Sequence, residues 1–343
     1  MSERVGGRAR RSVAKWVVLA AVGLAGFAAV KTGWFGFGWA QLKAMYWPRD
    51  EAILEWLPSG TAAVAIVDPH QMRLKDLAAD PSSLGPTIVR IRGDVLKVTG
   101  VDLAFDVDKL AVAPNLAVLR GRFDGQALAT KLAEYRYVKA DYSGRSYLVR
   151  AGEDAVLVVD DFLVYGDENS LKAAIDAKDG ASLAKDESFT SRLSRMGWNY
   201  PLLATISLAD DRPSLRTLIA GATGPRAVTV GVRASSGVDV RAWVETGSAT
   251  AAQDLAKTLD EQRARLAETL EPTAGAELAA LLAGAAKDAT VRVDPAAAQV
   301  EIRAHVRPDA LDAIVRAAQN SSALGATAKA LRLVQLLTPP APH

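Results

Sequence analysis

A group of five acidic side chains could bind calcium or supply a carboxylate pair: Asp154, Asp160, Asp161, Asp167 and Glu168. A calcium loop needs ligands at alternate positions and a closing glutamate at the twelfth, and this spacing does not provide them. The middle pair lies between two expected strands, and the last pair precedes an expected helix. Acids at such places form turns and favour the helix N-terminus. We therefore expect turn and capping roles here, and no metal site.

A serine and a lysine three residues apart, Ser182 and Lys185, match the Ser-x-x-Lys pattern of penicillin-recognising enzymes. The Lys-Thr-Gly triplet of those enzymes follows the serine, whereas Lys31-Thr32-Gly33 precedes it here, and no Ser-Asp-Asn triplet lies between. A Gly-x-Ser-x-Gly turn, a P-loop, a His-Glu-x-x-His motif and a Gly-x-Gly-x-x-Gly motif are all absent from the sequence. We expect no catalytic residues, and a chain that is not an enzyme.

The amino-acid composition excludes several further kinds of functional site. The 343 residues are 50% hydrophobic and 23% charged, with three histidines and no cysteine. This is ordinary globular composition, and it excludes disulfide scaffolds, cysteine-ligated metals and thiol catalysis. The sequence therefore predicts no bound cofactor.

The amino terminus carries the strongest functional signal. Residues 1–15 hold five basic side chains and one acid, and an apolar stretch follows that is interrupted only by Lys31. We expect a cytoplasmic tail over 1–15 and a transmembrane signal anchor over 16–38, because lysine can snorkel and tryptophan prefers the headgroup region. The expected anchor residues are Trp16, Lys31, Trp34 and Trp39. The positive-inside rule then places the N-terminus in the cytoplasm and the body outside the bacterial inner membrane, in the periplasm.

Other interpretations of this segment remain open. A signal peptide could be cleaved after Ala28, or Arg10-Arg11 could begin a twin-arginine export signal, or the stretch could be a buried core helix. Small residues recur every four positions at Ala21, Ala25 and Ala29. That spacing allows two membrane helices to approach closely, so self-association is a possible role. Outside the tail the charge is nearly balanced, which argues against a nucleic-acid partner.

Beyond the anchor we expect an α+β fold. A membrane-proximal helical collar spans 39–60, two α+β domains span 61–197 and 198–337, and residues 338–343 form a loose tail. Strand pairs alternate with amphipathic helices, for example Ala155–Val159 and Phe162–Tyr165 before a helix over Asn169–Ala177. Such repeated hairpin-plus-helix units predict antiparallel sheets covered by helices.

Two of the expected strands match in sequence as well as in pattern. Val238–Val244 aligns with Val300–Val306, and in both the alternate residues are apolar. The opposite face carries Arg241 and Trp243 in the first copy and Arg303 and His305 in the second. Arginine and tryptophan are enriched at the centres of protein interfaces, so these four residues form a candidate partner surface. A helix covering this face would instead make Trp243 part of the core.

The stretches Thr99–Asp102, Asp106–Val112 and Arg120–Asp124 resemble a pattern of uncharacterised bacterial envelope proteins. Those proteins have one N-terminal span and an extracytoplasmic α+β body, and the resemblance covers about residues 60–195. It implies an envelope location and brings no activity or functional residues with it. We expect a non-enzymatic, membrane-anchored binding or scaffold module for a protein or envelope component. The alternatives are an envelope hydrolase with unidentified carboxylates and a structural subunit of a larger membrane complex.

Overall fold

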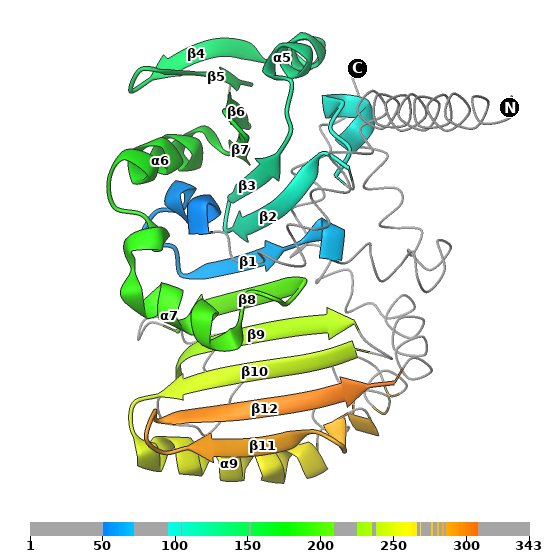
Figure 1. Cartoon of the computed structure of the whole chain (residues 1–343), viewed down its shortest axis with the longest axis vertical. Coiled ribbons are helices and arrows are strands. Elements are labelled where there is room, and N and C mark those ends of the chain that lie inside the picture. Colours follow the sequence, from blue (N-terminus) through cyan, green and yellow to red (C-terminus); the bar gives the residue numbers. More distant parts are fainter. Residues whose placement is uncertain are drawn as a thin grey trace, which may run out of the picture.

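A computed structural model describes residues 51–71, residues 95–208 except 104 and 151, and residues 225–307 with gaps at 235–237 and within 266–285. Its centre is one twelve-stranded antiparallel sheet with the strand order β11-β12-β10-β9-β8-β1-β2-β3-β7-β6-β5-β4 (Figure 1). The fold class is therefore α+β, as the sequence predicts. One sheet is present where the sequence predicts several, because β1 pairs with β2 on one side and with β8 on the other.

In the N-terminal half, the strands predicted at Ala155–Val159 and Phe162–Tyr165 and the helix predicted at Asn169–Ala177 are all present, as β6, β7 and α6. The strands are β1 (Ala63–Val67), β2 (Val107–Ala113), β3 (Leu116–Gly121), β4 (Val138–Tyr142), β5 (Arg145–Val149), β6 (Ala155–Val159) and β7 (Phe162–Gly166). The helices are η1 (Glu51–Trp56), α5 (Gly125–Ala133), α6 (Glu168–Asp179), η3 (Leu183–Lys185) and α7 (Glu187–Met196). The sequence analysis did not identify β4 or α7.

The C-terminal half begins with β8 (Leu202–Ser207), which the sequence analysis also missed. It continues with β9 (Pro225–Ala234), β10 (Val238–Thr246), α9 (Ala249–Ala264), β11 (Thr290–Asp294) and β12 (Gln299–Val306). The aligned strands pair directly, with Val238 opposite Val306 and Val244 opposite Val300. The sheet runs without interruption across the predicted boundary near residue 197, and the division into two domains stays a prediction.

One side of the sheet, here called the first face, includes Ile66, Val118 and Val164. Its apolar side chains form the largest core cluster with residues of η1, α6, η3 and α7. These helices cover the strands from β5 to β9 (Figure 1). The core includes Ile53, Leu54, Trp56 and Leu57, which are at most 1% exposed. The described end of the predicted collar is thus packed inside the body.

The opposite side, the second face, carries two smaller clusters. The helical residues 95–99 and α5 pack over β3, β6 and β7, and α9 packs over β10, β11 and β12. Asp167 caps α6, as the acidic pattern predicts, and its side chain accepts the backbone N–H of Ser170. Asp124, which was not predicted as a cap, accepts two backbone N–H groups of α5. Such caps satisfy N–H groups that have no partner within the helix.

The predicted anchor and its neighbours lie outside the described residues. These include Trp16, Lys31, Trp34, Trp39 and the alanines at 21, 25 and 29. Among the helices that the structure describes, none is long and apolar enough to cross a bilayer.

Candidate functional site

The four residues predicted as a partner surface lie together on the first face. In the register of β10 and β12, Arg241 is opposite Arg303, Trp243 is opposite Glu301 and Asp239 is opposite His305. Directly opposed side chains on one face of an antiparallel pair are close neighbours. We define the C-terminal surface as Asp239, Arg241, Trp243, Glu301, Arg303 and His305, together with Tyr200 and Arg233, which are described below.

A buried carboxylate organises the C-terminal surface. Glu301 Oε1 accepts hydrogen bonds from Nε of Arg241 at 2.5 Å and from Nε of Arg303 at 2.7 Å. The Glu301 side chain is 7% exposed, whereas Arg303 is 52% exposed. Burial alone would raise the pKa of Glu301, but the hydrogen bonds from the two arginines outweigh it and hold this pKa below its usual value. The group is an anion that fixes two guanidinium planes.

Trp243 joins the C-terminal surface to the core. The Arg241 guanidinium lies 5.2 Å from the centre of the Trp243 ring, and the same side chain packs against the large core cluster. Its Nε1 is buried and has no acceptor among the residues described. Nearby, His305 Nδ1 and an Asp239 carboxylate oxygen lie 2.7 Å apart, within hydrogen-bond distance, and each side chain is more than two-fifths exposed. The surface is therefore anchored at the tryptophan and open to solvent at the histidine.

Two residues that the sequence analysis missed extend this surface over β9. The Arg233 guanidinium lies 4.7 Å from the centre of the Tyr200 ring. The Tyr200 ring in turn occupies the space where a Cβ on Gly231 would stand, 2.7 Å from that position. A lone glycine in the middle of a strand marks such a close approach, and Gly231 is the signal that could have found this contact.

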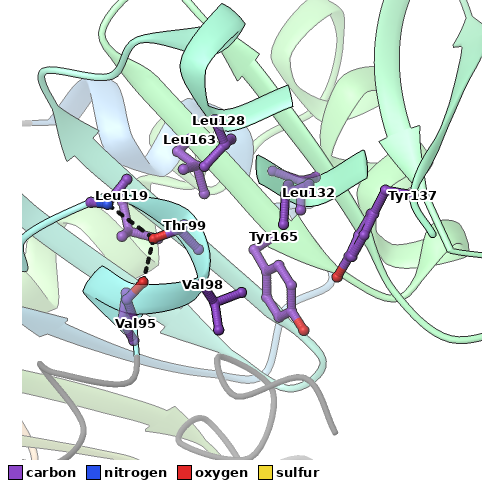
Figure 2. A pocket seen from close by; sticks show the side chains of 11 residues that line it. Val95, Val98, Thr99, Leu119, Leu128, Leu132, Tyr137, Leu163 and Tyr165 are labelled. Atoms are coloured by element: carbon purple, nitrogen blue, oxygen red, sulfur yellow. Dashed lines mark hydrogen bonds between the residues drawn. The ribbon is translucent and has the colours of Figure 1, made fainter. Parts of the chain in front are cut away.

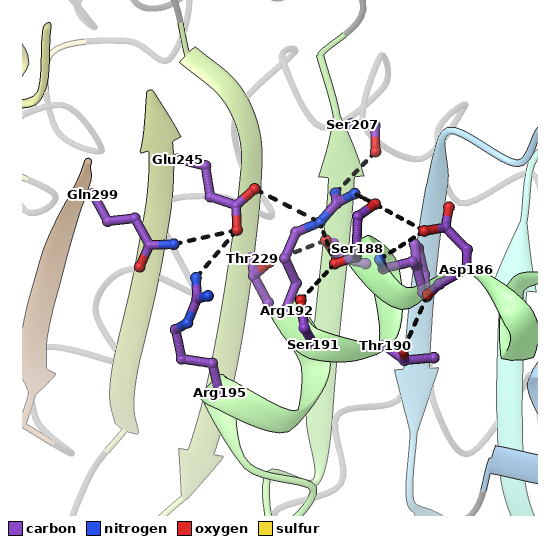
Figure 3. Close-up of polar contacts among 12 residues, drawn as sticks. Asp186, Ser188, Thr190, Ser191, Arg192, Arg195, Ser207, Thr229, Glu245 and Gln299 are labelled. Atoms are coloured by element: carbon purple, nitrogen blue, oxygen red, sulfur yellow. Dashed lines mark hydrogen bonds and ion pairs between the residues drawn. The ribbon is translucent and has the colours of Figure 1, made fainter. Parts of the chain in front are cut away.

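A second polar cluster fixes α7 to the edge of the C-terminal surface (Figure 3). Arg192, whose side chain is 8% exposed, donates to the Ser207 hydroxyl at 2.9 Å and lies 3.8 Å from a Glu245 carboxylate oxygen. Glu245 also accepts from Arg195 at 3.2 Å and from the Gln299 amide at 3.3 Å. Because Glu245 and Gln299 are on β10 and β12, this network connects the helix layer to the strands of the surface.

The acidic residues mostly serve the turns and caps that the sequence predicts. Asp160 occupies a turn with a φ of 51°, and Asp161 accepts from Arg120 Nε at 2.6 Å. Asp154 differs: one of its oxygens accepts from the hydroxyls of Tyr137 and Tyr165, each at 2.5 Å. Burial, followed by the hydrogen bond to Asp154, raises the pKa of both phenols well above the usual value.

Ser182 and Lys185 do not form a catalytic pair. Ser182 is 2% exposed, and the Lys185 amine donates to the Gly180 carbonyl at 2.5 Å. A nucleophile needs access to substrate and a base within hydrogen-bond reach. This geometry fits the chance match expected from the sequence.

No protein-family model matches the chain, and no curated protein matches its sequence. Two solved structures of TP0453 from Treponema pallidum have a similar arrangement. Crystal form III gives a TM-score of 0.42 at 9% identity, covering 76% of this chain and 96% of that one. Crystal form I gives 0.40 at 8% identity, covering 76% and 95%.

Proposed function

We propose that this chain is a non-enzymatic, membrane-anchored extracytoplasmic protein that binds a protein partner through its C-terminal surface. Residues 16–38 are its anchor, and the body lies in the periplasm. The observation that carries the binding role is the arrangement of Arg241 and Arg303 about one buried carboxylate, with Trp243 beside them.

The side chains of the C-terminal surface are suited to recognition. A general acid or base works best with a pKa near the operating pH, whereas the pKa of Glu301 is shifted downward. Two guanidiniums held in fixed planes lose little conformational entropy when a partner binds. A half-buried indole next to them supplies the apolar contact that dominates many interfaces.

The alternatives find less support in the described residues. A hydrolase would need carboxylates converging on a concave site, but Asp154 is enclosed by two phenols and by Arg150, whose guanidinium lies 3.0 Å away. A subunit packed through its juxtamembrane segment would leave apolar residues uncovered there. Instead, Ile53, Leu54 and Leu57 are fully buried in the core of the same chain.

Photocrosslinking in living cells tests the binding role. A photoreactive phenylalanine at Arg303 is expected to give a discrete crosslinked product, and one at Lys257 is the control. Lys257 is 80% exposed on α9, which packs on the second face. Adding Trp243→Ala should remove the product from position 303. Equal products at both positions, or none at 303, would contradict a partner at this surface.

Protease treatment of spheroplasts tests the location. A C-terminal tag on the full chain should be digested in intact spheroplasts, and the untreated band should run near 36.3 kDa. Protection of the tag would place the body in the cytoplasm and overturn the proposal. A band shorter by about 28 residues, the length predicted for a cleaved signal peptide, would show a soluble periplasmic protein.

A further inference from the structure

Strand β4 forms one end of the twelve-stranded sheet, and its outer edge has no neighbouring strand among the described residues (Figure 1). Its first residue, Val138, is 59% exposed, the highest fraction among the large apolar side chains in the described part of the chain. An edge strand with free main-chain groups is a template for pairing with another chain. This edge therefore offers both hydrogen bonds and apolar contact to a further strand.

Only alternate residues of β4 direct their main-chain groups outward. The strand joins β5 through the two-residue turn Ser143-Gly144, whose φ values of 47° and 75° are those of a type I′ turn. Such a turn closes on a hydrogen-bonded pair, so Tyr142 and the other even-numbered residues of β4 bond to β5. The N–H and C=O groups of Lys139 and Asp141 therefore point away from β5.

Both ends of β4 are fixed by the rest of the molecule. Directly before it, Tyr137 packs beside Tyr165 in a cluster of the second face (Figure 2), and its hydroxyl donates to Asp154 at 2.5 Å. At its end, the Tyr142 hydroxyl donates to Asp176 of α6 at 3.0 Å. A strand that is already ordered loses little conformational entropy when it pairs.

The sequence of β4 is complementary to itself in one antiparallel register. Two copies related by a twofold axis at Ala140 place Lys139 of each opposite Asp141 of the other, and Val138 opposite Tyr142. Opposite charges, and an aromatic ring with a β-branched residue, are favourable pairs at directly opposed positions. Within the part of the chain that the structure describes, Lys139 has no carboxylate partner of its own. The outward groups of residues 139 and 141 would also form four main-chain hydrogen bonds.

Charge excludes the neighbouring registers. Sliding one copy by two residues places either Lys139 or Asp141 opposite itself, and directly opposed like charges are destabilising. An odd shift would move every side chain to the wrong face of the sheet. The strand at the other end, β11, lacks this property, because pairing over its full length would place Arg292 opposite its own copy. A lysine on an edge strand usually prevents pairing, whereas here one self-pairing register neutralises it.

We propose that β4 pairs with β4 of a second copy of this chain, so that the two sheets become continuous. The interface is isologous, and each contact occurs twice. Strands of five residues bury little area, so we expect a weak, reversible dimer. The C-terminal surface lies toward the opposite end of the sheet and takes no part in this contact.

Disulfide crosslinking of the full chain tests the proposal, because the sequence has no cysteine. Ala140→Cys places two thiols at the axis, in a pair whose Cα atoms would lie about 4.5 Å apart, within the range of a disulfide. Oxidation of membranes with copper phenanthroline should give a reducible band at twice 36.3 kDa. The control is Lys257→Cys, at a side chain that is 80% exposed on α9, and it should remain monomeric.

Charge exchange separates this register from other contacts. In the Ala140→Cys chain, Lys139→Asp or Asp141→Lys alone creates two like-charge pairs and should slow crosslinking about tenfold. The two exchanges together restore both opposite-charge pairs and should recover most of the rate. Circular dichroism melts show whether each variant folds, and either single exchange suffices if the other does not. If Ala140→Cys does not fold, sedimentation of the full chain in detergent should show the same loss and recovery of the dimer.

Three results would overturn the proposal. No dimer band from position 140, or equal bands from 140 and 257, would mean that copies meet only by collision. A dimer that both single exchanges leave unchanged would place self-association elsewhere, for example at the alanines 21, 25 and 29 of the predicted anchor. Loss of the dimer without recovery in the double exchange would mean that residues 139 and 141 act within one copy.

Discussion

The positions of the arginines in the C-terminal surface depend on one carboxylate. Glu301 is 7% exposed, and it holds Arg241 and Arg303 through the same oxygen. A buried anion costs desolvation free energy that its two partners must offset, so removing its charge leaves both guanidiniums poorly paired. The sequence pattern put Arg241 and Arg303 on one face correctly. It did not single out Glu301, because alternation identifies the face of a residue and not its hydrogen bonds.

Glu301→Gln should lower the free energy of unfolding at pH 7 by about 1–3 kcal/mol, the usual cost of losing a charged hydrogen-bond partner. The folded-state pKa of Glu301 is depressed, so its stabilisation is present above its ordinary pKa of 4.5 and is lost as the pH falls below that value. Urea unfolding between pH 7 and pH 3 measures both effects. A variant with the wild-type pH profile would show that Glu301 has no such coupling.

The stability contributed by the two tyrosines at Asp154 falls as the pH rises, which is the opposite of the dependence expected for Glu301. Tyr137 and Tyr165 have folded-state pKa values above the ordinary 10.0, so their stabilisation is full below pH 10 and is lost as the pH rises further. Each such group contributes a slope of about 1.4 kcal/mol per pH unit. Tyr165→Phe should therefore flatten the fall of unfolding free energy between pH 10 and pH 11. An unchanged slope in urea titrations would show that Tyr165 ionises equally in the folded and unfolded chain.

At the scale of elements, the hairpins were predictable and some of their neighbours were not. Strands β6 and β7 are runs of apolar residues with Asp160 in the turn, and both were recognised. Strand β4 was missed because it is the edge strand of the sheet and contributes no fully buried residue: Val138 is 59% exposed, and Lys139 on the opposite face is also exposed. Helix α7 was missed because Arg192, a charged side chain, occupies a core-facing position. Tertiary contacts decide such cases, and a local pattern does not contain them.

The junction between β9 and Tyr200 gives a prediction at this scale. Gly231→Ala would place a Cβ 2.7 Å from the Tyr200 ring, so we expect a loss of about 1–3 kcal/mol in unfolding free energy. Gly60→Ala is the matched control, because a Cβ there meets nothing within 4 Å. Thermal melts should show the difference. Adding Tyr200→Ala to Gly231→Ala should recover part of the loss, and no recovery would place the strain elsewhere.

For the whole molecule, the result that sequence reasoning could not reach is the single sheet. Pairing of β1 with β8 joins segments far apart in the chain, and no periodicity within either segment specifies that partner. The same limit applies to η1. Its apolar residues follow a predicted membrane anchor, and their pattern alone suits a membrane-proximal helix as well as a core helix. Burial against the first face distinguishes the two.

Trp56 tests the place of η1 in the whole fold. Its side chain is 1% exposed, and its ring centre lies 5.9 Å from that of Phe162 on β7. Trp56→Ala should lower the unfolding free energy by about 3–5 kcal/mol, as for other large core truncations. Chemical denaturation of the full chain measures this. A change below 1 kcal/mol would show that the segment at 51–57 is a dispensable part of the core.

The position of β1 has a consequence for how the C-terminal surface would be presented to a partner. In strand order, β10 lies three places from β1 on one side and β7 lies three places from it on the other. At the usual strand spacing, each is roughly 14 Å from the strand at which the described chain enters the sheet. The C-terminal surface is on the first face. A body tethered through residues before β1 would thus be held near the middle of its sheet, with this surface on one flank. A bound partner would then be held beside the tether, at a sideways offset of that order.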